Sequence, residues 1–101
     1  MIIVRNVFRL KFGKAREAVA LVKEGMAIQK RVGSGAEMAT RLLTDVTGPF
    51  YTIVWEVSAP NLAAFESAAP RLMGDQEWQA NYQKLGALVD SGYREIFSVV
   101  E

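Results

Sequence analysis

The sequence predicts an α+β domain with the ferredoxin-like order β-α-β-β-α-β, in which helices cover one face of a four-stranded antiparallel sheet. Two observations predict it: apolar residues alternate in several short segments, and they recur at helical spacing in the segments between them. A third is a Gly-Pro connection that joins two strand segments as a hairpin. The expected strands are residues 2–11, 37–46, 50–58 and 93–100, and the expected helices are residues 14–31, 61–69 and 75–90.

The first expected strand carries one residue out of pattern. Its even positions are apolar except for Asn6, which predicts that Asn6 lies on the face that packs against the helices. A buried amide without a hydrogen bond costs about 1–3 kcal/mol, so Asn6 needs a partner. Two interpretations remain open: a satisfied structural amide, or an amide that lines a cleft and binds an oxygen of a substrate.

The first helix is predicted by a stripe of small and aliphatic residues, and residues 33–35 end it with a flexible turn. This helix faces the sheet because the charged side chains lie mostly off the stripe. The stripe contains Ala15, Ala18, Val19, Val22 and Met26.

The hairpin pairs residues 37–46 with residues 50–58 through the connection at 47–49. The second of these strands is apolar on both faces, which is typical of a central strand or of one covered by a partner. It carries Trp55, for which two interpretations are open. The indole is either part of the core or an aromatic wall for a flat ligand, with its N–H as a donor.

The second helical region is expected to have two parts. Asn61 is a candidate N-cap, and Pro70 is expected to end or kink the first part at Ala69. Asp75 is the candidate N-cap of the second part, and Ser91-Gly92 is expected to break it. The apolar stripe of this second part is Trp78, Tyr82, Leu85 and Val89.

Composition limits the classes of function. The 101 residues support one domain, 1–101, and 50% of them are hydrophobic. A net charge of +1 without a basic cluster predicts no nucleic-acid partner. The sequence contains no cysteine and no histidine, which excludes disulfides, thiolate metal sites, a thiol nucleophile and a histidine-based triad. We therefore expect no cofactor and no metal.

The start of the chain, residues 1–12, carries a charge by position 5 and is expected to be a strand rather than a signal peptide. No apolar run approaches the roughly 20 residues of a membrane-spanning helix. The expected location is the cytoplasm, without a membrane partner. The outer face of the sheet, with Ile3, Val7 and Val54, is too apolar to remain wet, and this predicts a homodimer.

A ligand site is expected in the gap between helices and sheet. Arginines in the strands, which are Arg5, Arg9, Arg41 and Arg94, either bind an anionic group or are solvated or paired with Glu37, Glu56 or Glu95. The glycines form no phosphate-binding motif. The candidate catalytic residues are Asn6, Trp55 and Tyr82, and the candidate substrate-binding residues are Phe8, Tyr51, Phe65, Trp78 and Arg41.

The chain resembles the dimeric α/β-barrel superfamily, close to the NIPSNAP-like and antibiotic-biosynthesis-monooxygenase-like proteins. The resemblance covers nearly the whole chain. It implies a homodimer with a ligand cleft between helices and sheet in each subunit. The residues that carry it are the first strand with Asn6, the Lys11-Phe12-Gly13-Lys14 entry to the first helix, the strand YTIVWEV and the helix NLAAFESA.

The resemblance also implies alternatives for function. In the haem-degrading branch of the superfamily, an asparagine and a tryptophan, which Asn6 and Trp55 resemble, act with a histidine on a late helix. That helix here offers Trp78, Asn81 and Tyr82 instead, which argues against haem degradation. The expected function is binding of a small aromatic or apolar molecule, as in a cofactor-independent monooxygenase. The alternative is a non-catalytic dimeric binding or interaction module.

Overall fold

A computed structural model of the protein describes residues 1–33 and 38–101. The order of its elements confirms the ferredoxin-like fold, with the second helical region divided into two helices. The elements are β1 (Ile2–Leu10), α1 (Ala15–Val32), β2 (Ala39–Thr44), β3 (Thr52–Ala59), α2 (Leu62–Met73), α3 (Gln76–Gly86) and β4 (Val89–Ser98).

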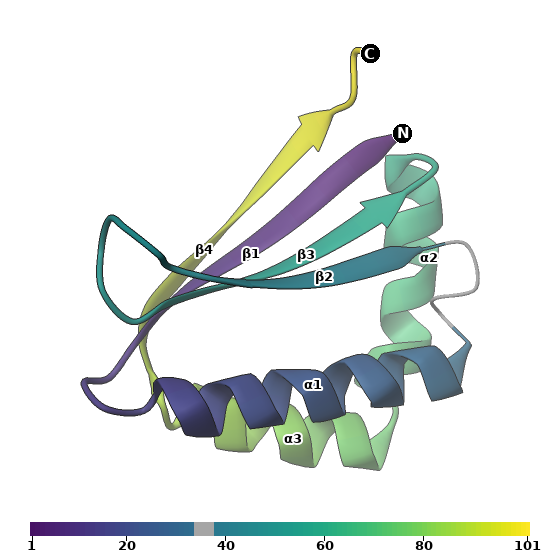
Figure 1. The fold of residues 1–101 in the computed structure, drawn as a ribbon. Coiled ribbons are helices and arrows are strands. Elements are labelled where there is room, and N and C mark those ends of the chain that lie inside the picture. Colours follow the sequence, from purple (N-terminus) through teal and green to yellow (C-terminus); the bar gives the residue numbers. More distant parts are fainter. Residues whose placement is uncertain (34–37) are drawn as a thin grey trace.

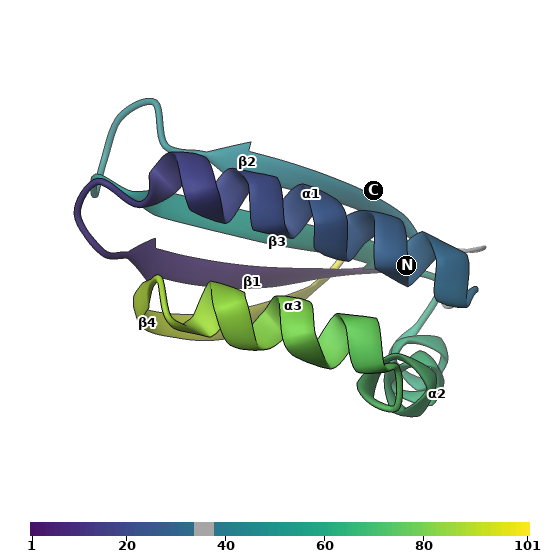
Figure 2. The same cartoon turned by 90° about the horizontal axis from the view of Figure 1, so that it is seen from below.

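The four strands form one antiparallel sheet in the order β2-β3-β1-β4. Helices α1 and α3 lie side by side under one face of this sheet, while α2 stands at one end of it (Figures 1 and 2). The opposite face, which we call the outer face, carries no helix in Figure 1. The domain is accordingly a slab with extents of 36 × 35 × 17 Å.

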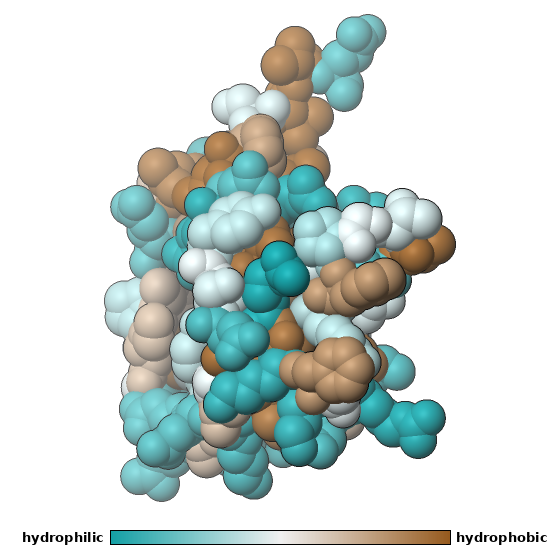
Figure 3. Space-filling model, turned by 90° about the vertical axis from the view of Figure 1, so that its left-hand side faces the viewer, coloured by the Kyte–Doolittle hydropathy of each residue, from teal (hydrophilic) through white to brown (hydrophobic). Residues whose placement is uncertain are grey.

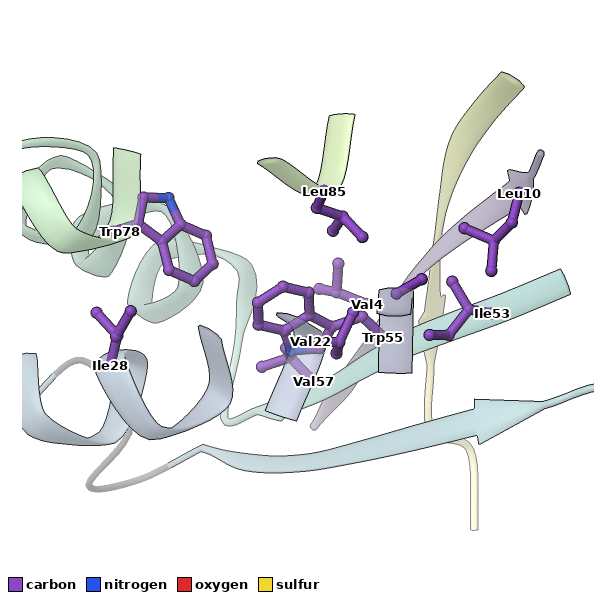
Figure 4. Close-up of a cluster of buried hydrophobic side chains, with 10 residues drawn as sticks. Val4, Leu10, Val22, Ile28, Ile53, Trp55, Val57, Trp78 and Leu85 are labelled. Atoms are coloured by element: carbon purple, nitrogen blue, oxygen red, sulfur yellow. The ribbon is translucent and has the colours of Figure 1, made fainter. Parts of the chain in front are cut away.

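The core lies between the sheet and helices α1 and α3. Even-numbered residues of β1 and odd-numbered residues of β3 point to this side, as their alternation predicts. Trp55 lies at the centre of the cluster in Figure 4, with Val22 of α1 and Leu85 of α3 near it. Trp55 is only 3% exposed, so its indole belongs to the core as well as to any site beside it.

The helix starts follow from their capping residues. The Asn61 side chain accepts a hydrogen bond from the Ala64 backbone N–H at 2.8 Å, and Asp75 accepts one from Trp78 at 3.0 Å. Both predicted N-caps are confirmed, because each satisfies a backbone donor that the helix leaves free. Gly33 ends α1 in the left-handed conformation, with φ of 84°. The predicted turn at 34–35 lies outside the described residues.

Two boundary predictions for the helices are wrong. α2 does not end at Ala69 but continues through Pro70 to Met73. Proline has a helical φ and removes only one hydrogen bond, and α2 has no fully buried residue, so a peripheral helix tolerates it.

No helix among the described residues is long and apolar enough to cross a membrane.

The last strand also differs from the prediction. Val89 is not a helical residue but the first residue of β4, and Gly92 lies inside that strand instead of breaking a helix. A Cβ at position 92 would lie 2.8 Å from Cδ1 of Phe8, so the glycine makes room for the phenyl ring on the neighbouring strand.

The connection between β2 and β3 is longer than predicted, because Phe50 and Tyr51 precede β3. Tyr51 has a positive φ of 58°, which a strand excludes. Phe50 is 76% exposed, and the side chains of Phe12 and Val46 near this end of the sheet are also largely exposed. Figure 3 views the molecule from this side and shows apolar groups scattered among hydrophilic ones.

We expect substitution of Gly25 in α1 to destabilise the fold. A Cβ there would lie 2.7 Å from Cη2 of Trp55 and 2.9 Å from Oδ1 of Asn81. Gly25→Ala should therefore lower the free energy of unfolding by about 1–3 kcal/mol, although alanine favours helices. Urea denaturation measures the change.

Gly86→Ala is the matched control, because Gly86 also lies in a helix and a Cβ there would meet nothing within 4 Å. The control should be neutral or slightly stabilising. If both substitutions changed the free energy of unfolding equally, the close contact between Gly25 and Trp55 would not be needed for the packing of α1 on the sheet.

Candidate functional site

A cavity of about 190 Å³ lies between the helix-facing side of the sheet and helix α2. Its wall is mostly apolar, with a few polar side chains from β1, α1, α3 and β4. Because α1 and α3 fill the space under the middle of the sheet, the cavity is at the α2 end of the domain (Figure 1).

Six of the eight residues proposed from the sequence line this cavity. They come from two strands, β1 and β3, and two helices, α2 and α3, and the fold brings them to one place. The six are Asn6, Phe8, Trp55, Phe65, Trp78 and Tyr82.

The other two lie elsewhere. Tyr51 is in the turn before β3, where its ring packs on Phe12 with centroids 5.0 Å apart. Arg41 is on the outer face of the sheet, where its guanidinium donates to the Glu56 carboxylate, with Nε at 2.9 Å. The odd position of Arg41 on β2 puts it on the face opposite Leu42 and hence away from the cavity.

Aromatic rings form a continuous row along one wall. The rings of Trp55 and Trp78 are 5.2 Å apart and tilted by 57°, and those of Trp78 and Tyr82 are 5.9 Å apart and nearly parallel. Trp78 is almost buried, whereas Tyr82 is 48% exposed at the end of the row. Such a wall suits a flat apolar ligand, because aromatic faces stack at these spacings.

Asn6 occupies the position in β1 that pairs with Trp55 in β3 and with Arg94 in β4. Its Nδ2 donates to the backbone carbonyl of Trp55 at 3.4 Å, and its Oδ1 accepts a hydrogen bond from Nε of Arg94 at 2.7 Å. The amide is therefore satisfied within the protein and is also part of the cavity wall. The interpretation as a satisfied amide is confirmed, and binding of a substrate oxygen by Asn6 stays a prediction.

Arg94 and Gln29 are polar residues of the cavity that were not among the eight candidate site residues. Parity alone could not place Arg94, because Ile96 shares its face while Tyr93 and Phe97 make the other face apolar as well. The register with Asn6 assigns it to the face that packs on the helices. Its guanidinium also lies 5.3 Å from the ring centroid of Phe65 in α2. The further lining residues are Gln29, Met38, Val57, Ala68, Ala69, Leu72 and Met73.

An ion pair fixes the start of α3 and hence the position of Trp78. Arg31 at the end of α1 donates to both carboxylate oxygens of Asp75, at 3.2 and 3.0 Å. The hydrogen bond from the Trp78 backbone N–H, together with Arg31, lowers the pKa of Asp75 below its ordinary value. The N-cap therefore remains a carboxylate at neutral pH.

The polar groups of the cavity are donors more than acceptors. The Trp55 Nε1–H has no hydrogen-bond acceptor among the described residues. Among the described residues, the terminal N–H groups of Arg94 make no hydrogen bond, since only its Nε donates, to Asn6. Within residues 1–33 and 38–101, no group of three or more acidic, cysteine or histidine side chains is placed to hold a metal ion. The arrangement is suited to an apolar molecule that carries an oxygen.

Solved structures with the same fold support this description. A NIPSNAP family protein from Agrobacterium tumefaciens is 26% identical, with a TM-score of 0.86 over 99% of this chain and 93% of that one. SnoaB, a cofactor-independent oxygenase from Streptomyces nogalater, is 16% identical, with a TM-score of 0.73 over 99% and 93%. An antibiotic biosynthesis monooxygenase is 17% identical, with a TM-score of 0.73 over the full length of both chains.

No family model matches the sequence, and no curated protein matches it significantly. The similarity to the oxygenases, at 16–17% identity, concerns the fold alone. The fold resemblance inferred from the sequence is nevertheless confirmed: this chain has the α+β fold of the NIPSNAP family proteins and of the antibiotic biosynthesis monooxygenases.

Proposed function

We propose that the protein binds a small aromatic or apolar molecule in the cavity and oxidises it as a cofactor-independent monooxygenase. The observation that carries the proposal is the cavity itself, in which Asn6 is the polar residue of an otherwise apolar strand face and stands beside the Trp55 wall. A packed core would have filled this space with side chains.

The size and lining of the cavity support binding. About 190 Å³ is larger than the voids of a well-packed core, and it suits one or two aromatic rings. The row of Trp55, Trp78 and Tyr82 supplies flat surfaces, while Phe65 and Leu72 close the α2 side. Few polar groups compete with this apolar contact.

The donors support oxidation of a phenol. A phenolate gives up electrons to O₂ more readily than a phenol does, and the second N–H of the Asn6 amide favours the ionised oxygen by hydrogen bonding. With 1-naphthol, one oxygen atom of O₂ would form the C=O bond at the ring carbon opposite the hydroxyl. The other would leave as water with the C–H and O–H hydrogens, and the ring would supply all four electrons.

The alternative is a protein that binds such a molecule without converting it. The same cavity supports this function, since among its described lining residues there is no carboxylate to act as a general base. Binding and turnover therefore have to be measured separately.

The direct experiment uses 1-naphthol with wild-type protein and the Asn6→Ala variant. Loss of the amide removes the hydrogen bond to Arg94, and we expect affinity or oxygen uptake to fall about tenfold. Calorimetry measures binding, and an oxygen electrode with product analysis measures turnover.

Gln83→Ala is the matched control, because this exposed amide of α3 is not part of the cavity wall. Binding without oxygen uptake would leave the non-catalytic function. Absence of binding by the wild type would contradict the proposed role of the cavity. Equal activity of Asn6→Ala and Gln83→Ala would contradict the proposed role of Asn6.

We also propose that two chains pack through their outer faces. The outer face carries Tyr93 and Phe97, which are 59% and 48% exposed in the single chain, whereas Val7 and Val54 beside them are already buried there, at 6% and 9% exposure. A second copy would remove this apolar surface from water.

The charges on the outer face suit such a partner. Glu95, Arg5, Glu56 and Arg41 lie in register across β4, β1, β3 and β2, so that their signs alternate. A second copy rotated by a two-fold axis along the strands would place each charge opposite one of the other sign. Within one chain, Glu56 is already held by Arg5 and Arg41.

Light scattering should give a mass twice the 11.2 kDa of one chain at micromolar concentration. Phe97→Glu on the outer face should shift the mass toward the monomer, because the dimer would bury the new charge. Leu62→Glu, at a residue 45% exposed on α2, is the control and should leave the dimer intact. A monomeric wild type would contradict the pairing.

A further inference from the structure

We propose that the ligand of the cavity carries a planar carboxylate and that Arg94 is the residue that selects it. This inference rests on the proposed binding function and narrows its ligand class. It is independent of whether the ligand is converted, because it concerns only the charge that the site accepts.

Arg94 is presented to the cavity in a fixed position. It pairs with Asn6 across β1 and β4, and its Nε–H donates to Oδ1 of Asn6 at 2.7 Å. Asn6 is itself held by the carbonyl of Trp55. This chain of hydrogen bonds orients the guanidinium and occupies its Nε–H, which leaves the two terminal nitrogens to bind a carboxylate end-on.

Helix α2 holds the same guanidinium from another direction. Its carbon lies 5.3 Å from the ring centroid of Phe65, a distance at which a cation interacts with an aromatic face. Phe65 also lines the cavity. The contact with Phe65 therefore helps to hold the Arg94 guanidinium at the cavity wall. Because the ring is uncharged, it does not neutralise the positive charge.

The charge of Arg94 is not neutralised by the protein. Among the described residues no carboxylate forms an ion pair with it, whereas Arg5 and Arg41 share Glu56 and Arg31 pairs with Asp75. Arg94 is also the one charged residue among the described residues that line the cavity. Arg94 is exposed to solvent, and an anionic group on an apolar ligand would give it a partner.

The ligand class follows from these contacts. The apolar wall binds the hydrocarbon part, and the free edge of Arg94 binds a group with two oxygen atoms in one plane. A carboxylate on an aromatic ring has this geometry. A neutral carboxamide has the same shape but lacks the charge, which makes it the matched probe.

The experiment compares 2-naphthoate with 2-naphthamide by calorimetry. Wild-type protein should bind the acid about 10- to 100-fold more tightly than the amide, the range expected for a charged hydrogen bond. Arg94→Gln should abolish this preference by weakening the acid alone. Retained binding of the amide by the variant shows that its cavity is intact.

Arg71→Gln is the control for the general effect of one positive charge, because Arg71 is exposed on α2 and does not line the cavity. This variant should keep the preference for the acid. Equal binding of acid and amide by the wild type, or a preference that survives Arg94→Gln, overturns the role of Arg94 while leaving the binding function intact. If neither probe binds, both proposals fail.

Discussion

The contact between Trp55 and Gly25 sets the distance between the sheet and helix α1, and the rest of the domain is arranged around it. The indole needs the space that a side chain at position 25 would occupy. Asn81 of α3 donates to the backbone carbonyl of Leu21 at 2.9 Å and lies over the same glycine. One tryptophan thus fixes both helices relative to the sheet and to each other.

This arrangement also explains why an open space remains. Helices α1 and α3 pack closely on Trp55 and under the middle of the sheet, but α2 buries no residue fully and stands at the end of the slab. The cavity forms where the close-packed layer gives way to α2. Its polar residues, Asn6 and Arg94, come from adjacent strands and are joined by a hydrogen bond, so the rigid sheet rather than a loop positions them.

Periodicity and capping chemistry were sufficient to predict the elements. Asn61 and Asp75 marked helix starts because their side chains accept local hydrogen bonds, a property that does not depend on tertiary structure. Gly92 and Pro70 were misread because their roles depend on a neighbouring strand and on the exposure of α2. Arg94 and Arg41 could be distinguished only by strand register, which places one beside Asn6 and the other beside Glu56 on the opposite face.

The most direct test of the account is an NMR titration of the two indole N–H resonances with an aromatic ligand, 2-naphthoate. The chain has only two tryptophans, Trp55 and Trp78, and both line the cavity, so that Trp78→Phe assigns the spectrum. We expect both resonances to shift and to saturate together. Unchanged indole resonances in the presence of excess ligand would show that the space beside Trp55 is not a binding site.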